Sequence, residues 1–165
     1  MFEIEIQNDA GYPINEGQLI EAAQWVLADH VPDQHCAMTV VISNDEHVAQ
    51  LNRQYRGVDA PTDILSFPAD EPPIVLPDEP RYLGDLVIAY PYAAAQTERE
   101  GHAVQESLVL LVVHGTLHLL GYDHDNMARR SEMWAAQARA LDALNIPLEI
   151  VPALEGAEHG EAEVD

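Results

Sequence analysis

The chain has 165 residues, 47% of them apolar, so it is long enough to bury one sizeable hydrophobic core. Its net charge is −22 and all seven of its cationic residues are arginines, a balance that repels polyanions at long range and disfavours nonspecific nucleic-acid binding. The sequence has no secretory signal, no apolar run near the roughly 20 residues of a membrane span, and no partner for an internal disulfide of Cys36; we therefore expect a soluble, cytoplasmic protein.

The first part of the chain predicts strands that alternate with helices. The predicted elements are a half-buried strand over 2–6, a helix over about 15–31, a buried strand over 36–43 and a helix over about 45–55. Asn15 is suited to cap the first helix, because a short polar side chain can accept a hydrogen bond from a free N–H of the first turn. Ser43 or Asn44 is suited to cap the second helix for the same reason.

The second part of the chain predicts two strands followed by three helices. The predicted elements are a short strand over 64–67, a strand over 82–89, and helices over about 91–100, from about 103 up to Gly121, and over about 125–144. The last helix is capped by Asp125 or Asn126. A proline-rich loop over 70–81 separates the two strands, and Gly84 inside the second strand indicates a bulge or a close approach by another group.

These elements predict an α+β fold. We expect a single domain over residues 1–153, in which a mixed β-sheet of about four strands packs against about five helices. One βαβ crossover is expected early in the chain, and a hairpin-like pair of strands is expected around the proline-rich loop. Residues 154–165 are acidic with almost no large apolar side chain, so we expect a disordered tail.

A histidine pattern near residue 114 is the strongest indication of chemistry. His114 and His118 follow six consecutive apolar residues, 108–113, which predict a buried helix. Four residues apart on a helix, their side chains share one face and can converge on one ion at about 2.1 Å per nitrogen. Gly121 offers the left-handed conformation that ends helices, so His124 can return as a third ligand. Three ligands leave one position open, which is typical of a catalytic zinc.

The alternative is that these histidines are simply packed or hydrogen-bonded in the core, as most histidine pairs on apolar helix faces are. The spacing, with glycine at the turn, is that of the zinc site of metzincin proteases, and favours the metal site. Those enzymes carry a general-base glutamate directly after the first histidine, whereas this chain has Gly115. The pattern therefore predicts the metal geometry without supporting peptide hydrolysis.

Three stretches together carry a resemblance to a known family. They are LNRQYRG with DAPTDILSFP over 51–57 and 59–68, LGDL over 83–86, and HGTLHLLGYDH over 114–124. In these motifs and their order the chain resembles the YbeY family of bacterial endoribonucleases and rRNA maturation factors.

The resemblance implies one Zn²⁺ per chain, bound by His114, His118 and His124. It implies cleavage of single-stranded RNA in rRNA processing, in maturation of the small-subunit rRNA 3′ end and in ribosome quality control. It also implies that Arg56 is a functional arginine, and that ribosomal RNA and the ribosome or ribosome-associated proteins are partners. The charge of −22 favours RNA delivered by the ribosome or by a protein partner over free RNA.

The general base stays open between Asp85 and Asp123, either of which could instead orient a histidine ring. For Asp85, a hydrogen-bonded carboxylate at a strand bulge is an equally good interpretation; for Arg56, the alternative is a surface ion pair. Two other functions also stay open. One is a ribosome-assembly factor with a structural metal, and the other is a metal-dependent hydrolase of a non-RNA substrate.

Overall fold

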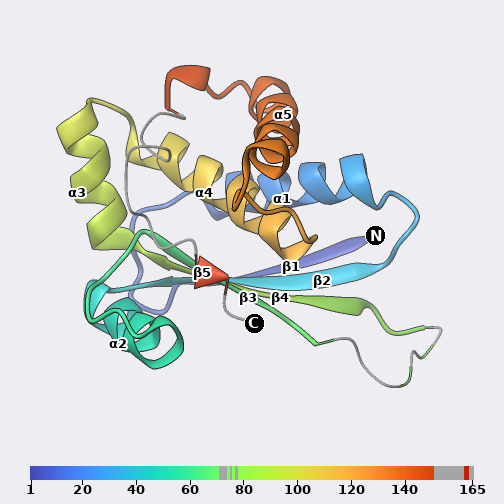
Figure 1. Ribbon diagram of the computed structural model, residues 1–165, viewed down its shortest axis with the longest axis horizontal. Helices are drawn as coiled ribbons and strands as arrows, with labels where there is room; N and C mark the ends of the chain where they lie inside the picture. The colour runs from blue at the N-terminus through green and yellow to red at the C-terminus, as the bar shows by residue number, and fades with distance from the viewer. Residues whose placement is uncertain (71–73, 75, 77, 151–161, 164–165) are drawn as a thin grey trace.

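A mixed β-sheet with helices on both faces forms the core of the molecule (Figure 1). The computed structural model describes residues 1–70, 74, 76, 78–150 and 162–163. The elements in chain order are β1 (Phe2–Gln7), α1 (Glu16–His30), β2 (Cys36–Ser43), α2 (Asp45–Arg56), β3 (Ile64–Pro68), β4 (Arg81–Ala89), α3 (Tyr90–Glu100), α4 (Val104–Leu119), α5 (Met127–Ala143), a 3₁₀ turn (Leu148–Ile150) and β5 (Ala162–Glu163).

The order of the strands in the sheet is β1-β2-β4-β3-β5. β1 pairs with β2 in parallel, so α1 between them forms the expected βαβ crossover. β2 pairs with β4 in parallel, and β3 pairs with β4 antiparallel across the proline-rich loop. The predicted α+β class, the mixed sheet and the five helices are confirmed, since β1 to β4 are the four expected strands.

The short strand β5 was not predicted, because two residues carry no readable alternation. Its backbone pairs in parallel with β3, through Leu65 with Ala162 and Ser66 with Glu163. These two positions are the only described part of the predicted tail; the remainder of 154–165 lies outside the described residues, so its predicted disorder stays a prediction.

The two faces of the sheet are covered by different helices. In β4, Leu86 and Ile88 belong to the large apolar cluster that includes α1 and α4, whereas Val87 and Ala89 belong to a smaller cluster with Val48 of α2. Alternate residues of a strand point to opposite faces, so α4 and α2 lie on opposite sides of the sheet (Figure 1). Any side chain on this sheet can therefore be assigned to the α4 side or to the α2 side.

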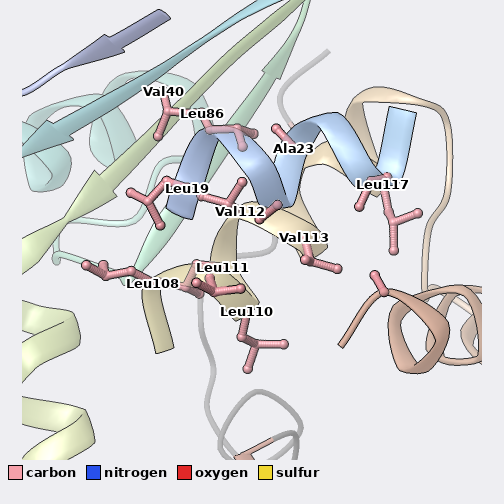
Figure 2. Packing of buried hydrophobic residues seen from close by; sticks show 14 of the residues in the cluster. Leu19, Ala23, Val40, Leu86, Leu108, Leu110, Leu111, Val112, Val113 and Leu117 are labelled. Carbon is pink, nitrogen blue, oxygen red and sulfur yellow. The ribbon is translucent and has the colours of Figure 1, made fainter. Parts of the chain in front are cut away.

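Helix α4 is the most buried helix, as the apolar run predicted. Every residue from Leu108 to Leu119 is buried. Figure 2 shows Leu19 and Ala23 of α1 gathered with Val112 and Val113 of α4. Among the described residues, no helix is both long and apolar enough to cross a membrane.

The structure shows which of the candidate residues caps each helix. Asn15 accepts a hydrogen bond from the N–H of Gln18, as predicted. Asn44, not Ser43, caps α2 by accepting from the N–H of His47. Asn126, not Asp125, caps α5 by accepting from the N–H of Arg129. All three capping side chains are asparagine, whose carbonyl oxygen reaches the N–H groups of the first turn.

The predicted irregularity at Gly84 is a β-bulge. The register between β2 and β4 shifts after Ala37, and Gly84 has φ +137°. A Cβ atom at this position would lie 2.2 Å from the carbonyl oxygen of Phe67. We expect Gly84→Ala to lower the free energy of unfolding by at least about 2 kcal/mol, because both the backbone strain and the contact must be relieved.

Urea denaturation of the parent protein and of Gly84→Ala measures this loss of stability. Gly11→Ala is the matched control. Gly11 also has positive φ (+70°), but a Cβ atom there meets nothing within 4 Å. Its loss is then limited to the left-handed strain, about 1 kcal/mol. Equal losses at the two positions would show that the contact with Phe67 is unimportant.

Candidate metal centre

The C-terminal half of α4 brings two imidazole rings face to edge in the core. His114 is 1% exposed and His118 is 3% exposed. Their Nε2 atoms are 3.1 Å apart, and the ring centroids are 4.7 Å apart. The predicted helical spacing therefore does place the two rings on one face, and the two Nε2 atoms point toward the same point in space.

The turn after α4 returns the third histidine to the same point. Gly121 has φ +101° and donates its N–H to the carbonyl oxygen of His118, while Tyr122 donates its N–H to the carbonyl oxygen of Leu117. This pair of hydrogen bonds is the Schellman motif that ends helices at glycine. The ring centroid of His124 lies 5.5 Å from that of His114 and 5.2 Å from that of His118. The predicted return of the chain at Gly121 is confirmed.

The outer nitrogens of the two helical histidines contact hydrogen-bond acceptors. His118 Nδ1 lies 2.9 Å from the carbonyl oxygen of Tyr122, and His114 Nδ1 lies 3.0 Å from Oε1 of Gln137. A carbonyl oxygen can only accept, so each Nδ1 carries a proton and donates it. In a neutral ring the Nε2 atom then keeps its lone pair. Both lone pairs face the shared point between the rings.

This arrangement fits a metal ion. Two Nε2 lone pairs 3.1 Å apart repel each other, and a cation between them removes that repulsion. One ligand atom from each of His114, His118 and His124 lies within 4.8 Å of the other two. Three imidazoles suit zinc and related transition metals, and leave a coordination position for water or substrate.

Helix α5 supplies the wall behind the three histidines. The ring centroid of Trp134 lies 5.8 Å from that of His114 and 5.5 Å from that of His124. The guanidinium of Arg130 lies 5.1 Å from the Trp134 ring centroid. The predicted helix over about 125–144 did not single out Gln137. The one available signal was a polar residue between the apolar residues Met133 and Leu141.

An open hollow of about 320 Å³ lies beside the turn. It is lined by Leu120, Gly121, Tyr122, Asp123, Arg129 and Glu132. Asp123, one of the two candidate bases, accepts a hydrogen bond from the N–H of His124 through Oδ1, at 2.7 Å. Its carboxylate thus helps to fix the backbone of the third histidine and also borders the hollow.

Asp85, the other candidate base, lies on the α2 side of the sheet. It is paired in register with Phe67 of β3, which packs against the α2 cluster. Its carboxylate accepts a hydrogen bond from the hydroxyl of Tyr82, which is also 2.7 Å from Oγ1 of Thr39. The structure therefore brings Asp85 together with Tyr82 and Thr39, and places it across the sheet from α4.

The Tyr82 contact predicts a pH dependence. Burial and then the hydrogen bond to Asp85 raise the pKa of Tyr82 to about 12, from 10.0. The unfolded chain therefore loses this proton first, so stability should fall as pH rises from about 10 to about 12. Asp85→Asn should move the pKa of Tyr82 back toward 10, though not completely, because the larger cause is burial.

Tyrosinate absorbance after a rapid pH jump, compared between the parent protein and Tyr82→Phe, isolates this titration. If the tyrosinate absorbance that is lost in Tyr82→Phe has fully developed near pH 10, the pKa of Tyr82 is not raised in the folded protein. If Asp85→Asn leaves the titration of Tyr82 unchanged, the hydrogen bond makes no contribution to it.

Arg56 ends α2 and is also on the α2 side of the sheet. Its Nη1 lies 3.3 Å from Oδ1 of Asn52. Asn52 is 1% exposed and donates a hydrogen bond to the carbonyl oxygen of Ala60, 2.7 Å away. The arginine is thus attached to a buried side chain that fixes the loop after α2. The three histidines thus converge at one point, whereas Arg56 is carried by α2 and Asp85 faces the α2 side of the sheet.

Comparisons with known proteins agree with the geometry. The sequence model of the family described as "Endoribonuclease YbeY" matches residues 4–145. An endoribonuclease YbeY of Chloroflexus aurantiacus is 40% identical over 153 residues, covering 90% of this chain and 99% of the relative. An endoribonuclease YbeY of Mycobacterium leprae is 35% identical over 144 residues, covering 84% of this chain and 81% of the relative.

A solved structure shares the fold. The solution structure of the protein TM1509 from Thermotoga maritima matches with a TM-score of 0.60 and 24% identity, over 98% of this chain and 100% of that one. At this identity the likeness speaks for the fold alone. The match of the family model over most of the chain, together with the two relatives, shows that the chain belongs to the YbeY endoribonuclease family.

Proposed function

We propose that this protein is a zinc-dependent endoribonuclease that cleaves single-stranded RNA in rRNA processing. The observation that carries the proposal is the convergence of three imidazole ligand atoms within 4.8 Å, two of them on rings whose outer nitrogens are hydrogen-bonded. Membership of the endoribonuclease family supplies the substrate class, since the relatives carry that activity in their names.

His114, His118 and His124 would hold the zinc ion. When bound, zinc supplies a Lewis acid and a water whose pKa is lowered to about 7. Gln137 and the Tyr122 carbonyl orient the rings of His114 and His118. Trp134 excludes water from the side of the histidines that faces α5. Asp123 is the better placed of the two candidate bases, because it borders the open hollow and accepts the N–H of His124, whereas Asp85 lies across the sheet.

For Arg56 we propose contact with a phosphate of the RNA. Its side chain is exposed at the end of α2, and a guanidinium can donate two parallel hydrogen bonds to a phosphate. Loss of a contact remote from the reacting bond raises KM, whereas loss of a contact that forms only in the transition state lowers kcat. The catalytic role of Asp85 stays a prediction beside its structural alternative at the bulge.

Ribosomal RNA and the ribosome, or ribosome-associated proteins, are the proposed partners, in the cytoplasm. The support is the family together with the charge of −22, which opposes the approach of free polyanions. Delivery by a ribosomal surface would supply the cationic groups that this chain lacks. Maturation of the small-subunit 3′ end and ribosome quality control are the processes that we propose for it.

Hydrolysis of a peptide is disfavoured by the surroundings of Gly115. A Cβ atom there would lie 2.7 Å from Cδ2 of Leu86 and 3.0 Å from Cδ1 of Ile64. The position that bears the glutamate in metzincins therefore faces the core, where a carboxylate would have to displace the side chains of Leu86 and Ile64. The assembly factor with a structural metal remains as an outcome of the following experiment.

The experiment is cleavage of a 3′-extended small-subunit rRNA fragment by zinc-loaded protein, with a fully duplexed fragment as the control substrate. We expect cleavage of the single-stranded fragment only. Arg56→Ala should lose about 10- to 100-fold in kcat/KM, as expected for a charge-assisted hydrogen bond. Arg53→Ala is the matched control, because Arg53 is exposed on the same helix and lies 3.6 Å from Asp59.

Zinc-loaded protein that cleaves neither free substrate should be tested on the same 3′ extension within small ribosomal subunits. Cleavage there would show that the ribosome must deliver the RNA, whereas no cleavage there either would overturn the nuclease proposal and leave the assembly factor. Equal activity of Arg56→Ala and Arg53→Ala would remove the phosphate role of Arg56. Cleavage that is the same in every variant, including the histidine variant below, would identify a contaminating nuclease.

A further inference from the structure

Helix α5 places an amide side chain where only apolar groups are expected. Gln137 is 1% exposed and lies in the stripe between Met133 and Leu141, both 0% exposed. Its Oε1 contacts Nδ1 of His114 at 3.0 Å. Its Nε2 atom is also buried and has no hydrogen-bond partner among the described residues.

Packing alone does not account for this arrangement. The buried N–H₂ group without an acceptor opposes folding, and methionine, of nearly the same length, would fill the same space without that group, at the cost of the acceptor for His114 Nδ1. A glutamine at this position therefore needs a reason other than packing. The carbonyl oxygen of the side chain accepts a hydrogen bond, and its donor is His114, one of the proposed metal ligands.

The contact decides which nitrogen of His114 carries the proton. Because Oε1 can only accept, the proton is on Nδ1, and Nε2 keeps the lone pair that points toward His118 Nε2, 3.1 Å away. In the other tautomer Nε2 would carry the proton and could not bind a metal. His118 is fixed in the same way, but by the backbone carbonyl of Tyr122. The tautomer of His114 is thus fixed by a side chain, and that of His118 by the backbone.

We propose that Gln137 is a positioning residue that holds His114 in the tautomer and ring orientation needed to bind the metal. This role rests on the proposed metal centre. It extends the centre from the helix and turn that carry the ligands to Gln137 of α5, 23 residues after His114. Outer-shell partners of this kind typically change metal affinity by about 10- to 100-fold when they are removed.

The test uses three variants of the full chain. Gln137→Met removes the acceptor and keeps the volume, and Gln137→Glu keeps an acceptor at the same place. Gln105→Met is the matched control, since Gln105 makes two hydrogen bonds with the backbone of Asn15, at 3.1 and 3.2 Å, at the other end of α4. The readouts are Zn²⁺ affinity by competition with a chromophoric chelator, the visible spectrum of the Co²⁺-loaded protein, and Tm of the metal-free protein.

For Gln137→Met we expect Zn²⁺ affinity to fall about 10- to 100-fold and the Co²⁺ spectrum to change. Tm of the metal-free protein should change little, because losing the acceptor of His114 Nδ1 and removing the unpartnered Nε2 group have opposite effects. Gln137→Glu should bind Zn²⁺ within a few-fold of the parent, and Gln105→Met should match the parent in Zn²⁺ affinity. Two results would overturn the role of Gln137. One is parental affinity in Gln137→Met, and the other is equal loss in Gln137→Met and Gln137→Glu. If the parent itself binds no Zn²⁺, the metal centre is wrong and this role falls with it.

Discussion

His118→Ala should leave the protein without its metal and lower RNA cleavage by about 100- to 1000-fold, the rate equivalent of the several kcal/mol that a catalytic metal supplies. The reason is that His118 provides a ligand atom 3.1 Å from that of His114, and its other nitrogen is hydrogen-bonded to the carbonyl oxygen of Tyr122, in the turn that carries His124. One substitution therefore removes a ligand and loosens the connection to another. Metal content per chain and the cleavage rate are the two measurements.

His47→Ala is the control for this variant. His47 is exposed on α2 and contacts Ser43 rather than the centre. Its metal content and cleavage rate should equal those of the parent. Circular dichroism must show that His118→Ala is folded, because the ring is buried and its removal leaves a cavity. A folded His118→Ala that keeps one metal per chain would show that the metal is bound elsewhere.

Gly115→Glu, which restores the residue that metzincins carry after the first histidine, should unfold the protein rather than create a peptidase. The new side chain would start 2.7 Å from a Leu86 methyl group, within the core on the α4 side of the sheet. Burial of an unpaired carboxylate costs several kcal/mol, a large part of the roughly 5–15 kcal/mol that stabilises a domain. We expect loss of the cooperative unfolding transition or insoluble protein.

Gly115→Ala separates the effect of added side-chain volume on stability from the effect of a buried charge. Alanine gains up to about 1 kcal/mol in helix propensity, against about 1–3 kcal/mol for overpacking beside Leu86 and Ile64, so a net loss below about 2 kcal/mol is expected. Urea denaturation measures both variants. A Gly115→Glu protein that folds and hydrolyses peptides would contradict this account of the core and would revive the protease alternative.

The local chemistry of the sequence predicted most of the secondary structure and the convergence of the three histidines. The asparagine caps, Gly121 and the apolar run before His114 affect the structure only within a few residues in sequence. Their effects can therefore be predicted without knowing the fold. The three histidines are predictable for the same reason, because α4 and one turn bring them together. Strand order could not be predicted, since it depends on contacts between distant segments.

The surroundings of Asp85 and Gln137 could not be predicted from the sequence patterns near them. The bulge at Gly84 interrupts the alternation of β4, so that Leu83 and Leu86 both join the core cluster on the α4 side and Asp85 faces the α2 side. Without the bulge position, the sequence does not say which face Asp85 occupies. The contact of Gln137 with His114 depends on how α5 packs against α4, which no pattern within either helix encodes.

The most direct test of the central claim is reconstitution of the metal-free protein with Zn²⁺ while cleavage of single-stranded RNA is measured. We predict that the rate is near zero without metal, rises in proportion to added Zn²⁺, and stops rising at one ion per chain, with His118→Ala inactive throughout. Full activity in the metal-free protein, or no activity at one Zn²⁺ per chain, would contradict the claim that the three histidines hold a catalytic metal.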